Sequence, residues 1–135
     1  MKKPMILLLI ALLCLLNGCT ASYRVADLSA VDSPQGNEAL QELLRQAKTK
    51  LGVSRGFERF DAGESSYIYI AGGMQSSSGY SVQLKSFREQ RDAVLLRVRV
   101  NPPPPRANTL PAQHNPGLLL QMNKTSKQVR VQWTP

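Results

Sequence analysis

The period of apolar and polar positions changes along the chain and predicts one helix followed by several strands. Between residues 37 and 52, apolar side chains recur at the spacing of one face of an α-helix; they are Leu40, Leu43, Leu44, Ala47 and Leu51. Asn37 suits the N-cap of this helix, and Gly52 suits the position after its last turn. Because the apolar face is narrow, we expect the helix to pack against a sheet.

From residue 65 onward the period is two, which is typical of β-strands. In the segment SSYIYIAGG at 65–73 both faces are apolar, so we expect this strand in the centre of a sheet. Turns at 89–92 and 123–127 are predicted to close hairpins between their flanking strands. The later segments alternate apolar and polar residues and predict antiparallel strands with one face on a core: GYSVQLKSF at 79–87, AVLLRVRVN at 93–101, GLLLQMNK at 117–124 and QVRVQWT at 128–134.

These segments together predict an α+β domain, in which one N-terminal helix packs on a mostly antiparallel sheet of five or six strands. A β-sandwich with one helix is the alternative. Residues 20–36 show no clear period and end in Ser33, Pro34 and Gly36, which favour turns. We interpret this segment as a tether; an early strand at residues 23–26 that joins the sheet is the alternative.

The chain opens with Lys2 and Lys3, and an apolar run follows from residue 4 to residue 16. This run is shorter than the roughly 20 apolar residues that cross a membrane, so the pattern is typical of a secretory signal peptide. The run ends in LNGC at 16–19, which resembles the lipobox of bacterial lipoproteins. The resemblance implies that the signal is cut before Cys19, that the Cys19 sulfur is diacylated and that the new amine is acylated. A structural thiol at Cys19 is the alternative.

The chain is therefore predicted to have three parts: a signal peptide at 1–18, a lipidated cysteine with a tether at 19–36, and a folded domain at 37–134. Two acyl chains hold a protein stably on a membrane, whereas a single chain does not. Thr20 stands where an aspartate favours the inner membrane, so the resemblance implies an outer-membrane lipoprotein of the cell envelope, with its domain facing the periplasm. The only other cysteine, Cys14, would leave with the signal.

The formal net charge is +8 at pH 7, and loss of Lys2 and Lys3 with the signal would lower it by two. For an exported lipoprotein, a basic domain favours anionic lipid headgroups, cell-wall polymers or acidic proteins as partners, and we expect no binding of nucleic acid. The basic residues are dispersed rather than gathered in one run, so the charge can be explained by solubility alone, without a charged partner.

The sequence offers little material for catalysis, and we expect that the protein is not an enzyme. Its one histidine, His114, lies in a proline-rich loop, where a surface role is the usual one. One histidine and one acylated cysteine do not make a metal site, so we expect neither a metal nor a cofactor. The serines at 76–78 have no visible paired base and are interpreted as turn residues.

A series of short motifs begins at the Gly79-Tyr80 turn. Two alternating strands follow it, then a proline-containing loop at 101–117, an apolar strand and a final valine pair at 129 and 131. In this order and spacing the motifs resemble the C-terminal domain of the PrcB family, over residues 57–134 or so of the chain. PrcB is named as a lipoprotein subunit of a protease complex, so the resemblance implies a protein-interaction module that docks or regulates a protease.

The expected protein-binding face consists of the glycine-tyrosine turn, the proline run and the later proline pair: Gly79, Tyr80, Pro102, Pro103, Pro104, Pro105, Asn115 and Pro116. For the loop at 101–117, a stiff crossover between strands is the alternative. For the whole protein, the alternative is a structural envelope lipoprotein. Its basic strand faces, with Arg97, Arg99 and Arg130, would contact anionic cell-wall polymer or lipid.

Overall fold

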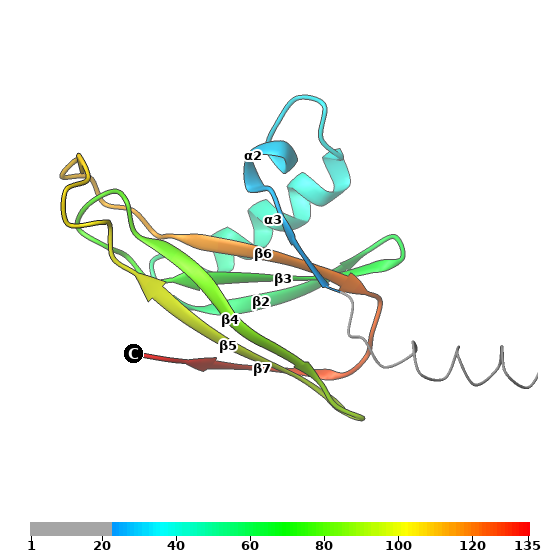
Figure 1. Cartoon of the computed structure of the whole chain (residues 1–135). Helices are drawn as coiled ribbons and strands as arrows, with labels where there is room; N and C mark the ends of the chain where they lie inside the picture. The colour runs from blue at the N-terminus through cyan, green and yellow to red at the C-terminus, as the bar shows by residue number, and fades with distance from the viewer. Residues whose placement is uncertain (1–22) are drawn as a thin grey trace, which may run out of the picture.

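Two β-sheets make up most of the computed structural model, which describes residues 23–135 (Figure 1). The four-stranded sheet has the order β1-β6-β3-β2, and the three-stranded sheet has the order β4-β5-β7. Between β1 and β2 the chain forms two helices, α2 (Leu28–Val31) and α3 (Glu38–Leu51). The strands are β1 (Tyr23–Ala26), β2 (Arg55–Ala62), β3 (Ser65–Gly72), β4 (Ser81–Glu89), β5 (Ala93–Asn101), β6 (Gly117–Asn123) and β7 (Gln128–Trp133).

The two sheets face each other across one apolar core, which makes the fold a β-sandwich. Apolar residues of β7, among them Trp133, pack against the edge of this core. The buried residues come from β3 and β6 on one side and from β4 and β5 on the other: Ile68, Ile70, Leu120 and Met122 against Val82, Val94, Leu96 and Val98.

The outer face of the four-stranded sheet is covered by α3. Leu44 and Ala47 of the helix are buried against Tyr67 and Tyr69 of β3 and against Leu119 of β6. The isoleucines of β3 point the other way, into the sandwich core. This arrangement confirms the central position expected for β3 and explains why both of its faces are apolar.

The start of α3 confirms the helix predicted from the sequence. The Asn37 side-chain oxygen accepts hydrogen bonds from the backbone N–H groups of Ala39 and Leu40, at 2.9 and 3.3 Å. These bonds satisfy two of the N–H groups that have no partner within the helix. At the other end, Gly52 follows the last turn with a φ of 60° and donates to the Lys48 carbonyl.

The strands are mostly antiparallel, as predicted, but the expected single sheet of five or six strands is wrong in its topology. The described residues form two sheets, so the sandwich alternative is the closer one. The strand β2 was not predicted, because its sequence RGFERFDA has no clean alternation. It lies at the edge of its sheet, where most of its side chains are only half-buried.

Of the two predicted hairpins, one is confirmed and one is wrong. The turn at 89–92 joins β4 and β5, which pair antiparallel. The segment 123–127 instead carries the chain from one sheet to the other, and β7 pairs parallel with β5. Backbone bonds from Lys124 to Glu64 and from Gln128 to Asp92 fix this crossing at both of its ends.

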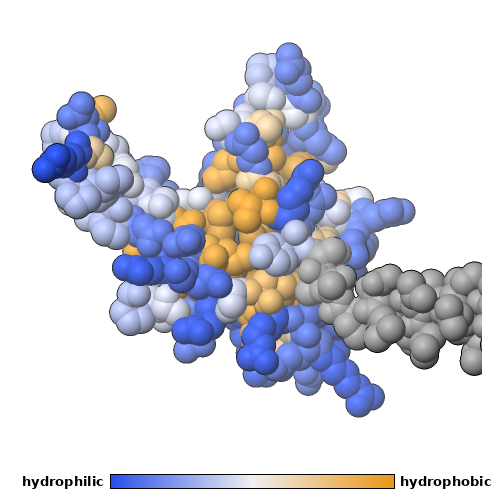
Figure 2. All heavy atoms as spheres, in the orientation of Figure 1, coloured by the Kyte–Doolittle hydropathy of each residue, from blue (hydrophilic) through white to orange (hydrophobic). Residues whose placement is uncertain are grey.

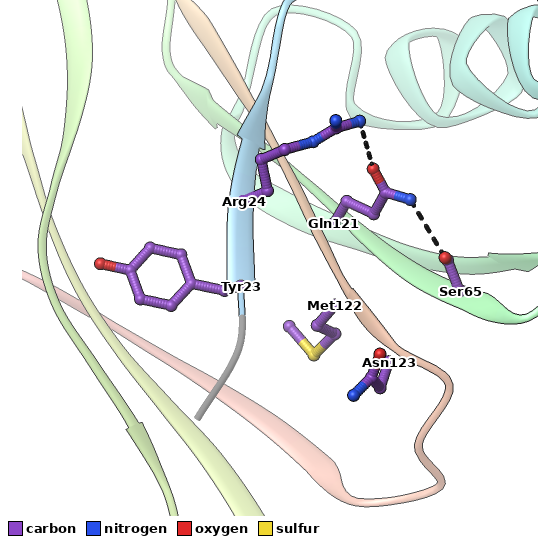
Figure 3. Close-up of a pocket in the computed structure, with 6 residues that line it drawn as sticks. All are labelled: Tyr23, Arg24, Ser65, Gln121, Met122 and Asn123. Atoms are coloured by element: carbon purple, nitrogen blue, oxygen red, sulfur yellow. Dashed lines mark hydrogen bonds between the residues drawn. The ribbon is translucent and has the colours of Figure 1, made fainter. Parts of the chain in front are cut away.

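Residues 23–26, which we interpreted as part of a tether, form the strand that was the alternative. β1 pairs antiparallel with β6 and places Tyr23 opposite Met122 and Ala26 opposite Leu119. Figure 3 shows Tyr23 and Arg24 on opposite sides of this strand, with the Arg24 guanidinium donating to the Gln121 side chain at 2.8 Å. The apolar surface in Figure 2 gathers over β1 and β6, between the helices and β4.

The predicted signal peptide and Cys19 lie outside the described residues, so lipidation of Cys19 stays a prediction. Within residues 23–135, no helix combines the length and the apolar composition that a membrane span requires.

Candidate functional site

The loops at 73–80 and 102–116 meet at one end of the sandwich, which we call the loop end (Figure 1). Gln75 and His114 exchange two backbone hydrogen bonds, of 2.7 and 3.0 Å, in an isolated antiparallel bridge. Farther out, the Ser78 N–H donates to the Leu110 carbonyl at 3.0 Å, and the Leu110 N–H donates to the Ser78 hydroxyl at 2.9 Å. The two loops therefore form one hydrogen-bonded surface.

Gly79 is required where these loops touch. Its φ is +93°, in the region that favours glycine, and a Cβ atom built on it would lie 2.7 Å from Cβ of Pro103. Pro103 is half-buried, whereas Pro102, Pro104 and Pro105 are exposed. The predicted proximity of Gly79 and the proline run is therefore confirmed at Pro103, although Pro103 packs inward.

Asn115 and Pro116 connect the loop end to the sandwich. The Asn115 side chain accepts from the Gly73 N–H at 3.0 Å and donates to the Gly52 carbonyl at 3.1 Å. The Pro116 carbonyl accepts from the Gly72 N–H at 2.8 Å, and the proline ring is fully buried. Pro116, predicted as part of a binding face, therefore packs mainly into the sandwich.

Tyr80 directly follows Gly79 in the chain. It is half-buried and lines a hollow of about 350 Å³ between α2 and the segment 114–117. Asp32 and Lys48 lie in the same hollow with their charged atoms 3.5 Å apart, and the Lys48 ammonium is 5.9 Å from the centre of the Tyr69 ring. Burial and, to a smaller extent, the charge of Asp32 raise the pKa of the Tyr69 hydroxyl.

Three apolar side chains that the sequence did not single out are exposed at the loop end. Val53 is 65% exposed, Met74 is 40% exposed and Leu110 is 69% exposed. The Met74 N–H donates to the Val53 carbonyl at 3.2 Å, so two of them lie on adjoining backbone. The signal that could have found them is an isolated large apolar residue within a loop of glycine, serine and proline.

The loop end presents both apolar and charged groups to solvent. Exposed apolar side chains and proline rings lie on the loops, and the hollow is lined by Asp32, Lys48 and His114. Among residues 23–135, no three histidine, cysteine, aspartate or glutamate side chains come together in a group able to hold a metal ion.

Comparison with known proteins adds one finding. No curated protein and no solved structure gives a match to the chain. A family model described as PrcB C-terminal matches residues 66–123, which run from the second residue of β3 to the last residue of β6 and include both loops of the loop end. The match confirms the resemblance predicted from the sequence but stops before β7. Residues 66–123 of the chain are therefore similar to the PrcB C-terminal family.

Proposed function

We propose that this protein is a lipid-anchored lipoprotein of the outer membrane, facing the periplasm, that binds a protein partner through its loop end. The partner class is a protease or a subunit of a protease complex, because residues 66–123 match the PrcB C-terminal family model and both loops fall inside that match. The proposal assigns the protein no catalytic step of its own.

The observation that carries the proposal is that exposed apolar side chains at the loop end project from hydrogen-bonded backbone. Exposed apolar side chains that adjoin one another are typical of protein-binding sites, and Val53 and Met74 lie on adjoining backbone. Here Val53, Met74 and Leu110 project from backbone that is hydrogen-bonded to neighbouring segments. A surface that is already ordered loses less conformational entropy on binding than a mobile loop would.

The direction of the strands supports the same proposal. β1 begins at Tyr23, opposite Met122 near the end of β6, whereas Gly117 at the start of β6 adjoins the loop end. β3 pairs with β6 along this direction, and its eight residues extend over about 26 Å. The two ends of the sandwich are therefore about that far apart. An anchor at Cys19 would therefore attach to the end of the sandwich opposite the loop end and leave the loops free for a partner.

The test is a crosslinking capture from detergent-solubilised envelopes with the intact protein, a Leu110→Ala variant and a Tyr80→Ala variant. Loss of an interface hot spot costs about 2 kcal/mol, so we expect about 30-fold weaker capture of a protease or its subunit. The matched control is Val25→Ala, which removes an exposed apolar side chain from β1, away from the loops.

Capture that Leu110→Ala and Tyr80→Ala leave unchanged would contradict the proposed surface. Recovery of cell-wall material alone, released by salt, would favour the structural alternative instead. The anchor is tested separately with Cys19→Ala, which should leave an unprocessed precursor of lower mobility in gel electrophoresis. Normal processing and membrane attachment of that variant would contradict the lipoprotein assignment.

A further inference from the structure

Among residues 23–135, neither helix lies over the outer face of the three-stranded sheet (Figure 1). Strand pairing places Arg97 beside Ser86 and Gln132, and Arg99 beside Gln83, on the side opposite the buried valines of β5. The same side carries two further arginines, one on β4 and one on β7. We call the exposed set Arg88, Arg97, Arg99 and Arg130 the arginine face.

Within the part of the chain that the structure describes, no carboxylate pairs with the arginine face. The only acidic residue within β4, β5 and β7 is Glu89, which is the strand partner of the buried Val94. Its carboxylate forms an ion pair with the Lys127 ammonium at 2.8 Å. Arg130 donates to the uncharged Gln128 side chain at 3.3 Å. The four ion pairs between described residues involve none of the four arginines. Their charges are therefore free to attract an anion from solution.

The arginine face is also hollowed. A depression of about 300 Å³ has half-buried Leu95 in its lining, with the guanidinium-bearing side chains of Arg88, Arg97 and Arg130 beside it. Guanidinium groups form paired hydrogen bonds with phosphate oxygens. An apolar surface ringed by such groups suits a ligand that joins a phosphate to an apolar body, as a phospholipid does.

The position of the anchor adds a second, independent argument. Only residues 20–22 separate Cys19 from Tyr23, so the two Cα atoms can be at most about 14 Å apart. The Tyr23 ring stacks on the ring of Phe87 with their centroids 4.5 Å apart. Phe87 precedes Arg88 on β4, the edge strand of the three-stranded sheet. A lipid on Cys19 would therefore hold the membrane surface within reach of the arginine face.

We propose that the arginine face lies on the anionic phospholipid headgroups of the membrane that carries the anchor. The proposal rests on the lipid anchoring proposed above and adds an orientation to it. Each basic residue close to an anionic membrane strengthens binding by about fivefold, and the effect falls off within a Debye length of about 10 Å. The short connection to Cys19 keeps the domain close to the membrane, whereas a tether of residues 19–36 would let the face move much farther away.

The test uses the lipidated full-length protein in vesicles, with a fluorescent label whose reduction by dithionite measures exposure. The label is attached to a cysteine introduced by Gln132→Cys on the arginine face, since the Cys19 sulfur is acylated. A second preparation carries the label at Ser76→Cys on the loop end. Vesicles of phosphatidylcholine alone are compared with vesicles that also contain phosphatidylglycerol.

We expect phosphatidylglycerol to protect the label at position 132 but not the label at position 76, and high salt to abolish the protection. In the double variant Arg97→Gln, Arg99→Gln, the ratio of protected to exposed label at position 132 should fall by about 25-fold. The variant Lys50→Gln with Arg106→Gln removes the same charge from a helix and a loop tip and should change little.

Equal exposure at position 132 in both kinds of vesicle would overturn the proposal, and pelleting with purified cell wall through the same arginines would assign the face to that polymer. A protein that does not enter vesicles would show that the anchoring itself is wrong. None of these outcomes depends on Leu110 or Tyr80, so failure of the partner-binding surface is measured separately.

Discussion

The two sheets of this sandwich share one core, yet their outer faces differ completely. Seven of the eight residues of β3 are buried, because the sandwich core covers one face and α3 covers the other. On β5 the residues alternate, with Val94, Leu96 and Val98 buried and Arg97 and Arg99 exposed. The difference shows that a strand with two apolar faces requires a covering element, whereas an alternating strand leaves its polar face available for other partners.

The largest expected effect tests the covered face. Leu44 of α3 is only 1% exposed and packs on the outer face of the four-stranded sheet, so Leu44→Ala removes buried methyl groups and leaves a cavity. We expect a loss of about 2–5 kcal/mol in the free energy of unfolding, measured by urea denaturation. The control Leu110→Ala makes the same chemical change at an exposed position and should cost less than about 0.5 kcal/mol. Equal losses in both variants would show that α3 does not cover the sheet.

The loop end is intermediate between the face that α3 covers and the arginine face, because its two loops pack on each other. Gly79→Ala combines a positive φ with the contact to Pro103, and we expect it to lower the free energy of unfolding by about 1–3 kcal/mol. Gly63→Ala is the matched control, since Gly63 has a φ of +60° and open space around it. Thermal unfolding of both variants isolates the contribution of the Pro103 contact, and identical melting temperatures would contradict that contribution.

Alkaline titration tests the environment of Tyr69 on the sheet face that α3 covers. Because the pKa of the Tyr69 hydroxyl is raised above its usual value, the neutral form is favoured in the folded state. The stability from Tyr69 is then complete below pH 10, the usual value, and is lost as the pH rises through the raised pKa. Asp32→Asn should lower that pKa, and the ultraviolet absorbance of tyrosinate measures it. An unchanged titration would show that Asp32 has no influence.

The smallest expected effect belongs to the bare face. Arg97→Gln and Arg99→Gln remove exposed side chains without a carboxylate partner, so each should change the free energy of unfolding by less than about 0.5 kcal/mol. Urea denaturation of the double variant provides the measurement. A large loss of stability would mean that these arginines hold the sheet together rather than serve a partner.

The helix and most strands could be predicted because their patterns are local. The period of Leu40 to Leu51 and the N-cap at Asn37 set α3, and alternation sets β4 and β5. The strand β2 could not be found this way, because its side chains are half-buried at a sheet edge and show no period. The segment 23–26 becomes a strand only by pairing with β6, far away in the sequence.

The candidate site divides in the same way. Glycine and proline mark the loops directly, because these residues restrict or permit unusual backbone angles wherever they occur. The sequence could not show that Pro116 is buried, that Pro103 packs on Gly79, or that Leu110 is exposed, since each depends on segments distant in the chain.

Local patterns in the sequence are enough to place α3 and the strands β3 to β7 and to show which side of the alternating strands is apolar. The division of the strands into two sheets, the crossing of 123–127 between them and the parallel pairing of β7 with β5 depend on the folded chain as a whole. The reason is physical: the periods depend on backbone geometry within a few residues, but a sheet partner is chosen by burial of apolar faces that come together only when the whole chain folds.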